Sequence, residues 1–125
     1  MSAQESNSIN VNGEVILELG KYGGPIFLGR SDGANMRQKF GLDDLDKSDQ
    51  TVHVIFPQNT KGVGSSFFLA MFGMSIRNLG SAEEFAKKFR FSGPDFVVQD
   101  LIPTSVERAL FEGGLFGDND LVHPD

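Results

Sequence analysis

The chain has 125 residues, no cysteine, no tryptophan and only two histidines, His53 and His123. Without cysteine there can be no disulfide, no thiolate nucleophile and no cysteine-bound zinc or iron–sulfur centre, and we expect a cytoplasmic protein. His53 lies in a predicted strand and His123 in a predicted tail, so the two imidazoles are not expected to meet at one site. We therefore expect no enzyme activity, no catalytic residue, no metal site and no cofactor.

Long apolar runs and basic side chains are also scarce. The longest largely apolar stretch, residues 63–76, is interrupted by Gly and Ser and is shorter than the roughly 20 residues that span a bilayer. Eleven Lys and Arg against 17 Asp and Glu give a formal net charge of −6, which disfavours contact with a duplex phosphate backbone. We expect neither a membrane segment nor direct nucleic-acid binding.

The residues that are present suffice for one core. Hydrophobic residues make up 39% of the chain and charged residues 22%, and twelve Phe can fill the interior of a single domain. The polar start predicts a flexible leader over residues 1–12. The end is acidic, Gly-containing and without basic residues, which predicts an acidic flexible tail over residues 112–125. The domain itself is expected over residues 13–111.

Four segments have the patterns of β-strands. Residues 14–19 alternate, which predicts a strand with one wet face. Residues 26–28 follow a Gly- and Pro-rich turn and are expected to pair with that strand as a hairpin. Residues 51–56 are apolar on both faces and predict a central strand covered on both sides. Residues 96–98 predict a further brief strand.

Capping patterns predict four helices. The first begins after Ser31 or Asp32 and ends at Gly41, with Arg37 facing outward. The second covers residues 67–79 and is apolar nearly all round, so it should be buried. Two more follow capping boxes at Ser81 with Glu84 and at Thr104 with Glu107. This order of elements predicts an α/β fold with a small mixed sheet.

An acidic linker is expected over residues 42–50. Its four aspartates predict a solvated acidic surface: Asp43, Asp44, Asp46 and Asp49. An EF-hand calcium loop starting at Asp44 is excluded, because its sixth position is Asp49 rather than Gly and its twelfth is Ile55 rather than Glu. The remaining functional interpretation of this surface is electrostatic contact with a basic partner.

A Gly-rich turn, Gly62-Val63-Gly64-Ser65-Ser66, leads into the long apolar helix. It lacks the ending of a P-loop, the spacing of a dinucleotide fingerprint and the elbow of a serine hydrolase. Ser65 or Ser66 either caps the helix or is modified, since a phosphate would bring a charge of about −2 to a helix N-terminus. Arg30 and Arg37 are either an anion contact or interface anchor, or ordinary solvent-facing charges.

Several motifs occur in a recognisable order: Gly29-Arg30-Ser31-Asp32-Gly33, Arg37, the strand at residues 52–56, Gly64-Ser65-Ser66-Phe67, Phe72-Gly73, Leu79-Gly80 and Phe85. This order resembles a bacterial STAS-like domain family of unknown function, related to the STAS domains of anti-sigma-factor antagonists. The resemblance covers residues 14–111 and implies a mixed sheet with helices mainly on one face. It also implies that the exposed strand-to-helix turn docks a protein. In antagonist-type domains that protein is an ATP-binding anti-sigma kinase, which phosphorylates a Ser at the turn.

Two functions are expected. The first is a non-enzymatic regulatory domain that docks a protein partner through the helix start at residues 65–72. Its expected contact residues are Arg30, Arg37, Ser65, Ser66, Phe67 and Phe68, with Ser65 or Ser66 as the phosphorylation candidate.

Gly64 stands where antagonist-type domains usually carry an acidic residue. A copy without the switch would be a plain binding protein, such as a phage or mobile-element inhibitor of a host defence complex that uses the acidic surface as a nucleic-acid mimic. The sequence leaves open whether two copies form a homodimer.

Overall fold

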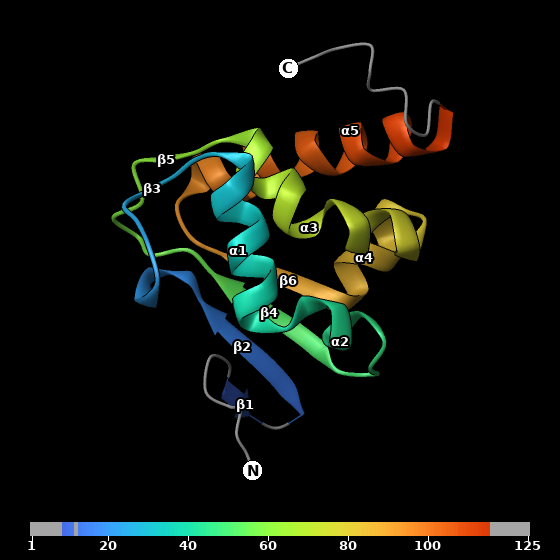
Figure 1. Cartoon of the computed structure of the whole chain (residues 1–125), viewed down its shortest axis with the longest axis horizontal. Helices are drawn as coiled ribbons and strands as arrows, with labels where there is room; N and C mark the ends of the chain where they lie inside the picture. The colour runs from blue at the N-terminus through green and yellow to red at the C-terminus, as the bar shows by residue number, and fades with distance from the viewer. Residues whose placement is uncertain (1–8, 12, 116–125) are drawn as a thin grey trace.

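The computed structural model describes residues 9–11 and 13–115. The fold is α/β, with a four-stranded sheet and a separate two-stranded sheet (Figure 1). The strands are β1 (Ile9–Val11), β2 (Glu14–Glu18), β3 (Ile26–Phe27), β4 (Thr51–Ile55), β5 (Gly62–Val63) and β6 (Phe89–Ser92). The helices are the 3-10 turn η1 (Leu19–Lys21), α1 (Arg30–Phe40), α2 (Leu42–Asp46), α3 (Ser65–Leu79), α4 (Ala82–Lys88), the π-helical η2 (Phe96–Leu101) and α5 (Ile102–Leu115).

The large sheet has one apolar face. Its strand order is β1-β2-β4-β6, with β1 antiparallel to β2 and the other pairs parallel, so the mixed sheet expected from the sequence is confirmed. The register sets Val15 beside Val52 and Leu17 beside Val54, and all four side chains are buried. Phe89 of β6 extends the first of these rows. Because side chains alternate along a strand, these residues share one face and the polar residues share the other.

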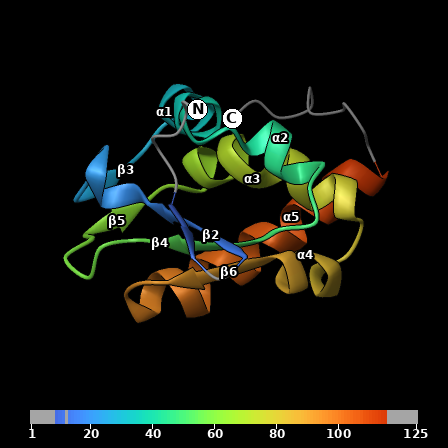
Figure 2. The same cartoon turned by 90° about the horizontal axis from the view of Figure 1, so that it is seen from below.

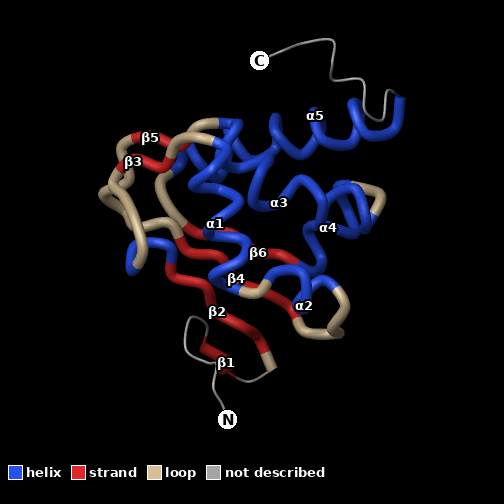
Figure 3. Tube along the Cα trace, viewed as in Figure 1, coloured by secondary structure: helices blue, strands red, loops and turns tan. Residues whose placement is uncertain are grey.

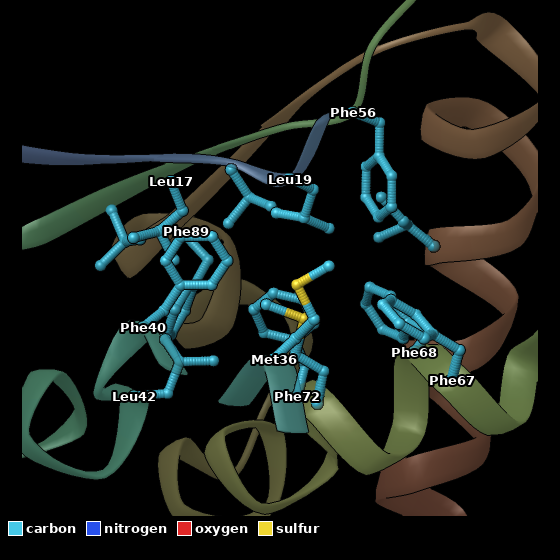
Figure 4. Packing of buried hydrophobic residues seen from close by; sticks show 14 of the residues in the cluster. Leu17, Leu19, Met36, Phe40, Leu42, Phe56, Phe67, Phe68, Phe72 and Phe89 are labelled. Atoms are coloured by element: carbon cyan, nitrogen blue, oxygen red, sulfur yellow. The ribbon is translucent and has the colours of Figure 1, made fainter. Parts of the chain in front are cut away.

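Helices α1 and α3 cover the apolar face (Figure 2). Phe68 and Phe72 of α3 and Met36 of α1 point into the core below the strands (Figure 4). The helix α3 also packs against α5, which explains why it is apolar nearly all round. The approach of α1 to α3 is close at Gly33, where an added Cβ would collide with the carbonyl oxygen of Phe67. The small residue is thus required by packing.

The opposite face of the large sheet is accessible. Thr51 is exposed, and His53 and Ile55 are half-buried. The expectation that this strand is covered on both faces is therefore wrong, because only the side chains of one face, Val52, Val54 and Phe56, are buried. The central position of β4, between β2 and β6, is confirmed.

Three local expectations also need correction. The segment expected as an acidic linker begins with a helix, α2, and residues 96–98 lie in η2 instead of a strand. In the latter case Val97 is buried, so tertiary packing overrides the β-propensity of the Phe-Val-Val run. The strand β3 forms no hairpin with β2, because η1 carries the chain away from the large sheet and β3 pairs with β5.

The expected ends of the domain also shift. Ile9–Val11, assigned to the leader, form β1, and residues 112–115, assigned to the tail, belong to α5. Residues 1–8, 12 and 116–125, which hold the rest of the leader and tail, lie outside the described residues. Two helix ends are confirmed: Gly41 ends α1 in the left-handed conformation, and the Ser81 side chain accepts a hydrogen bond from the Glu84 amide.

Candidate functional site

The small sheet brings the starts of two helices together. Its strands β3 and β5 are parallel neighbours, and they lead into α1 and α3 respectively. The two helices therefore begin side by side at one corner of the molecule (Figures 1 and 3). Gly29 and Gly64 are the N-cap residues, and neither helix has a side-chain cap. We call residues 26–30 and 62–66 the β3–β5 corner.

Ile26 and Leu28 form an exposed apolar ridge on this corner. Their exposed fractions are 54% and 56%, whereas Phe27 between them is buried, as alternation along an extended segment requires. The neighbouring positions, Gly62 of β5 and Gly64 just after it, are glycines. A Cβ on Gly62 would lie 4.0 Å from Ile26, and one on Gly64 would lie 2.9 Å from Leu28. Because these positions carry no side chain, nothing from them covers the ridge.

A pocket of about 500 Å³ opens beside the ridge, between residues 22–24 and α1. Tyr22, Ile26 and Met36 supply apolar surface to it. Its polar wall comes from one side of α1: Asp32, Asn35, Gln38 and Lys39. The Nζ of Lys39 lies 5.0 Å from the ring centroid of Tyr22. The two side chains therefore form a cation–π contact beside the pocket.

The two serines of the corner differ in exposure. Ser66 is exposed, whereas Ser65 is half-buried and its hydroxyl accepts a hydrogen bond from Nη1 of Arg108 at 3.4 Å. Neither serine caps α3, because Gly64 occupies that position. Arg30 is exposed and forms no ion pair with residues 9–11 or 13–115. The corner thus combines an apolar ridge with one free cation and one accessible hydroxyl among the described residues.

Phe67 and Phe68 do not belong to this surface. Their exposed fractions are 1% and 0%, and their rings pack on Phe27 and Phe72 with centroid distances of 5.5 and 5.0 Å. Both are core residues, because the first turn of α3 lies against α1 and the sheet. The expectation that these two rings contact a partner is corrected accordingly.

Arg37 is buried rather than outward-facing. Its Nη1 donates to the Met71 carbonyl oxygen at 2.8 Å and to the Ser75 hydroxyl at 3.0 Å. Its Nη2 lies 2.7 Å from carboxylate oxygens of both Asp43 and Asp46. We call these five residues the Arg37 cluster. The cluster ties α1, α2 and α3 together, so Arg37 cannot serve as an interface anchor.

The acidic surface is smaller than the sequence predicts. The Asp46 side chain is only 10% exposed and accepts hydrogen bonds from Ser75 as well as Arg37. Asp43 is 75% exposed but shares the same guanidinium. Asp44 and Asp49 remain as exposed carboxylates without this partner. Arg37 thus pairs with two of the four aspartates, and the inner one, Asp46, is a structural element.

His53 lies on the accessible sheet face. Its Nε2 is 2.6 Å from the Ser92 hydroxyl, and its Nδ1 is 3.5 Å from Nη2 of Arg90. His53 thus links β4 to Ser92 and Arg90 of the neighbouring strand β6.

No three His, Asp or Glu side chains among residues 9–11 and 13–115 are placed to hold a metal ion together. Across the same residues, no helix combines the length and the apolarity needed to cross a bilayer. In comparisons with known proteins, no family model, curated protein or solved structure matches the chain.

Sequence reasoning missed the ridge and the pocket. The alternation of Ile26, Phe27 and Leu28 was a usable signal, since a two-residue strand can bury only one face of such a triplet. The pairing of β3 with the Gly62-x-Gly64 segment was not readable, because it depends on a long-range contact.

Proposed function

We propose that the chain is a non-enzymatic protein-interaction domain that docks a protein partner through the β3–β5 corner. The observation that carries this proposal is the ridge of Ile26 and Leu28, two adjacent aliphatic side chains that are each more than half exposed. Water contact with such a surface is unfavourable, and a partner that covers it removes that cost.

The surroundings of the ridge support docking as well. Arg30 stands just beyond Leu28 in the chain, and Ser66 lies in the adjacent first turn of α3. An apolar centre with polar residues at its rim is the usual anatomy of a protein interface. The residues proposed to contact the partner are therefore Ile26, Leu28, Arg30, Ser65 and Ser66.

Regulation by phosphorylation is proposed at Ser66. Its hydroxyl is exposed, whereas that of Ser65 is half-buried beside Arg108. A phosphate at Ser66 would add a charge of about −2 next to the ridge and change its fit to an apolar partner surface. The partner class that the STAS-like resemblance implies, an ATP-binding kinase of the anti-sigma type, is consistent with such a switch.

Site-specific cross-linking in the native host tests the docking surface. A photoreactive amino acid is placed at position 66, or at position 74 as the control, because Met74 is 52% exposed on a later turn of the same helix. We expect a defined cross-linked species from position 66 only, identified by mass spectrometry. Leu28→Asp should abolish that species, since it places a charge in the apolar contact.

Two results would contradict the proposal. One is an equal yield of the same species from positions 66 and 74, and the other is a cross-link at position 66 that survives Leu28→Asp. The phosphorylation component is tested separately by Ser66→Glu, which should weaken the cross-link made from position 28.

A further inference from the structure

One edge of β3 carries main-chain groups without partners. The carbonyl oxygen of Pro25 accepts a hydrogen bond from the Lys61 amide at 2.7 Å, and that of Phe27 accepts one from the Gly64 amide at 2.8 Å. Peptide groups alternate in direction along a strand, so Ile26 directs its N–H and C=O to the edge opposite β5. No strand of the described chain pairs with that edge.

The pocket lies along the same strand. Ile26 and Phe27 line it together with the loop at residues 22–24. The peptide groups of Gly23 and Gly24 make no main-chain hydrogen bond with the described residues, so they too remain available. A peptide strand that paired with Ile26 would pass beside the pocket mouth and could insert alternate side chains into it.

The residues that line the pocket indicate which side chains such a peptide should carry. Tyr22 and Ile26, which are 37% and 54% exposed, form the accessible apolar surface of the pocket, and it suits an apolar side chain. Asn35 presents a carboxamide, whose donor and acceptor match a peptide group. The carboxylate of Asp32 has no ion pair within residues 9–11 and 13–115, so it can pair with an incoming cation.

We infer that the partner contributes an extended peptide strand, which adds to the free edge of β3 and carries an apolar residue and, two positions away on the same face, a lysine or arginine. The apolar side chain occupies the pocket, and the cation reaches Asp32. This inference rests on the proposed docking function and specifies the chemistry of the partner. The net charge of −6 favours the approach of such a basic segment.

Selection from a displayed library of random short peptides against the full chain tests the inference. We expect enriched sequences that share a bulky apolar residue two positions away from Lys or Arg. The strongest peptide is then titrated into isotope-labelled protein, where amide shifts should concentrate on residues 22–26 and 32–39. Absence of a shared motif, a motif without a basic residue, or shifts elsewhere on the molecule would overturn the inference.

Matched variants separate the contributions of charge and backbone. Asp32→Asn should weaken the selected peptide by about two- to fivefold, as expected for an exposed ion pair. The control is Asp44→Asn, an exposed aspartate in the first turn of α2, as Asp32 is in α1, but outside the pocket. Equal effects of the two substitutions would contradict the role of Asp32.

The main-chain donor is tested at Ile26. Ile26→Pro removes the N–H that points away from β5. Ile26→Ala keeps this N–H and loses only the side chain. Neither substitution removes a group that is hydrogen-bonded to β5. Proline should weaken the peptide about two- to tenfold more than alanine does. Equal affinities would contradict strand addition.

The failure of this inference differs from the failure of the docking function. A Leu28-dependent cross-link at position 66 without any peptide motif would leave docking in place and exclude the strand. Peptide binding at the β3 edge without any cross-link from position 66 would contradict docking at the corner and leave an isolated peptide-binding groove.

Discussion

The two ends of α1 depart in opposite ways from the rule that apolar side chains are buried and charges are exposed. Near its first residue, the ridge of Ile26 and Leu28 is more than half exposed. Near its last residue, the side chains of Arg37 and Asp46 are 11% and 10% exposed.

The buried charges of the Arg37 cluster have a structural explanation, whereas the exposed ridge does not. The guanidinium donors of Arg37 all point to partners within the chain, so the buried charge is explained by the fold itself. The ridge is more than half exposed, and the glycines beside it, Gly62 and Gly64, carry no side chain to cover it. Contacts within the chain do not explain the exposed ridge. The ridge is therefore the feature that indicates a function.

The largest effect is expected from Arg37→Ala. Removal of the guanidinium leaves the Asp46 carboxylate with Ser75 but without its cation, and takes one donor from the Met71 carbonyl, in a site that water hardly reaches. The free energy of unfolding should fall by about 3–5 kcal/mol. Urea denaturation measures it. Arg30→Ala at the other end of the helix is the control and should change stability by less than about 0.5 kcal/mol. Similar losses at both positions would mean that Arg37 is not the buried charge of this helix.

A smaller effect distinguishes the two carboxylates of the cluster. Asp46→Asn keeps the shape of a side chain that is 10% exposed but removes its charge beside Arg37 and Ser75. We expect a loss of about 2 kcal/mol, because hydrogen bonds to charged groups contribute about 1.5–3 kcal/mol. Asp43→Asn should cost less than about 1 kcal/mol, because its side chain is 75% exposed and water replaces the contact. If Asp43→Asn proved the more damaging, the assignment of Asp46 as the inner carboxylate would be wrong.

Much of the fold follows from local signals. The alternation over residues 14–19 predicts β2, the Ser81 capping box predicts α4, and Gly41 predicts the end of α1. These elements depend on neighbours within a few residues, which is the range over which a sequence pattern is informative.

The candidate site depends on contacts that such patterns do not contain. Ser65 and Ser66 are correctly placed at a strand-to-helix corner, but whether Phe67 is exposed depends on how α1 crosses α3 at Gly33. The burial of Arg37 depends on Ser75, which lies 38 residues away in the chain. Long-range packing decides which polar residues are structural, so the sequence alone could not separate Arg37 from Arg30.

The smallest effect on stability is expected for Leu28 in the ridge, although its side chain is large and apolar. Leu28→Ala removes a side chain that is 56% exposed, so little buried area is lost and the unfolding free energy should change by less than about 0.5 kcal/mol. Leu42→Ala, just after the other end of α1, is the matched control, because Leu42 is fully buried and its truncation should cost about 2–5 kcal/mol. Urea denaturation of the two variants gives the ratio directly. A cost at Leu28 approaching that at Leu42 would show that the ridge contributes to the stability of the chain itself, and the argument that it is kept for a partner would fail.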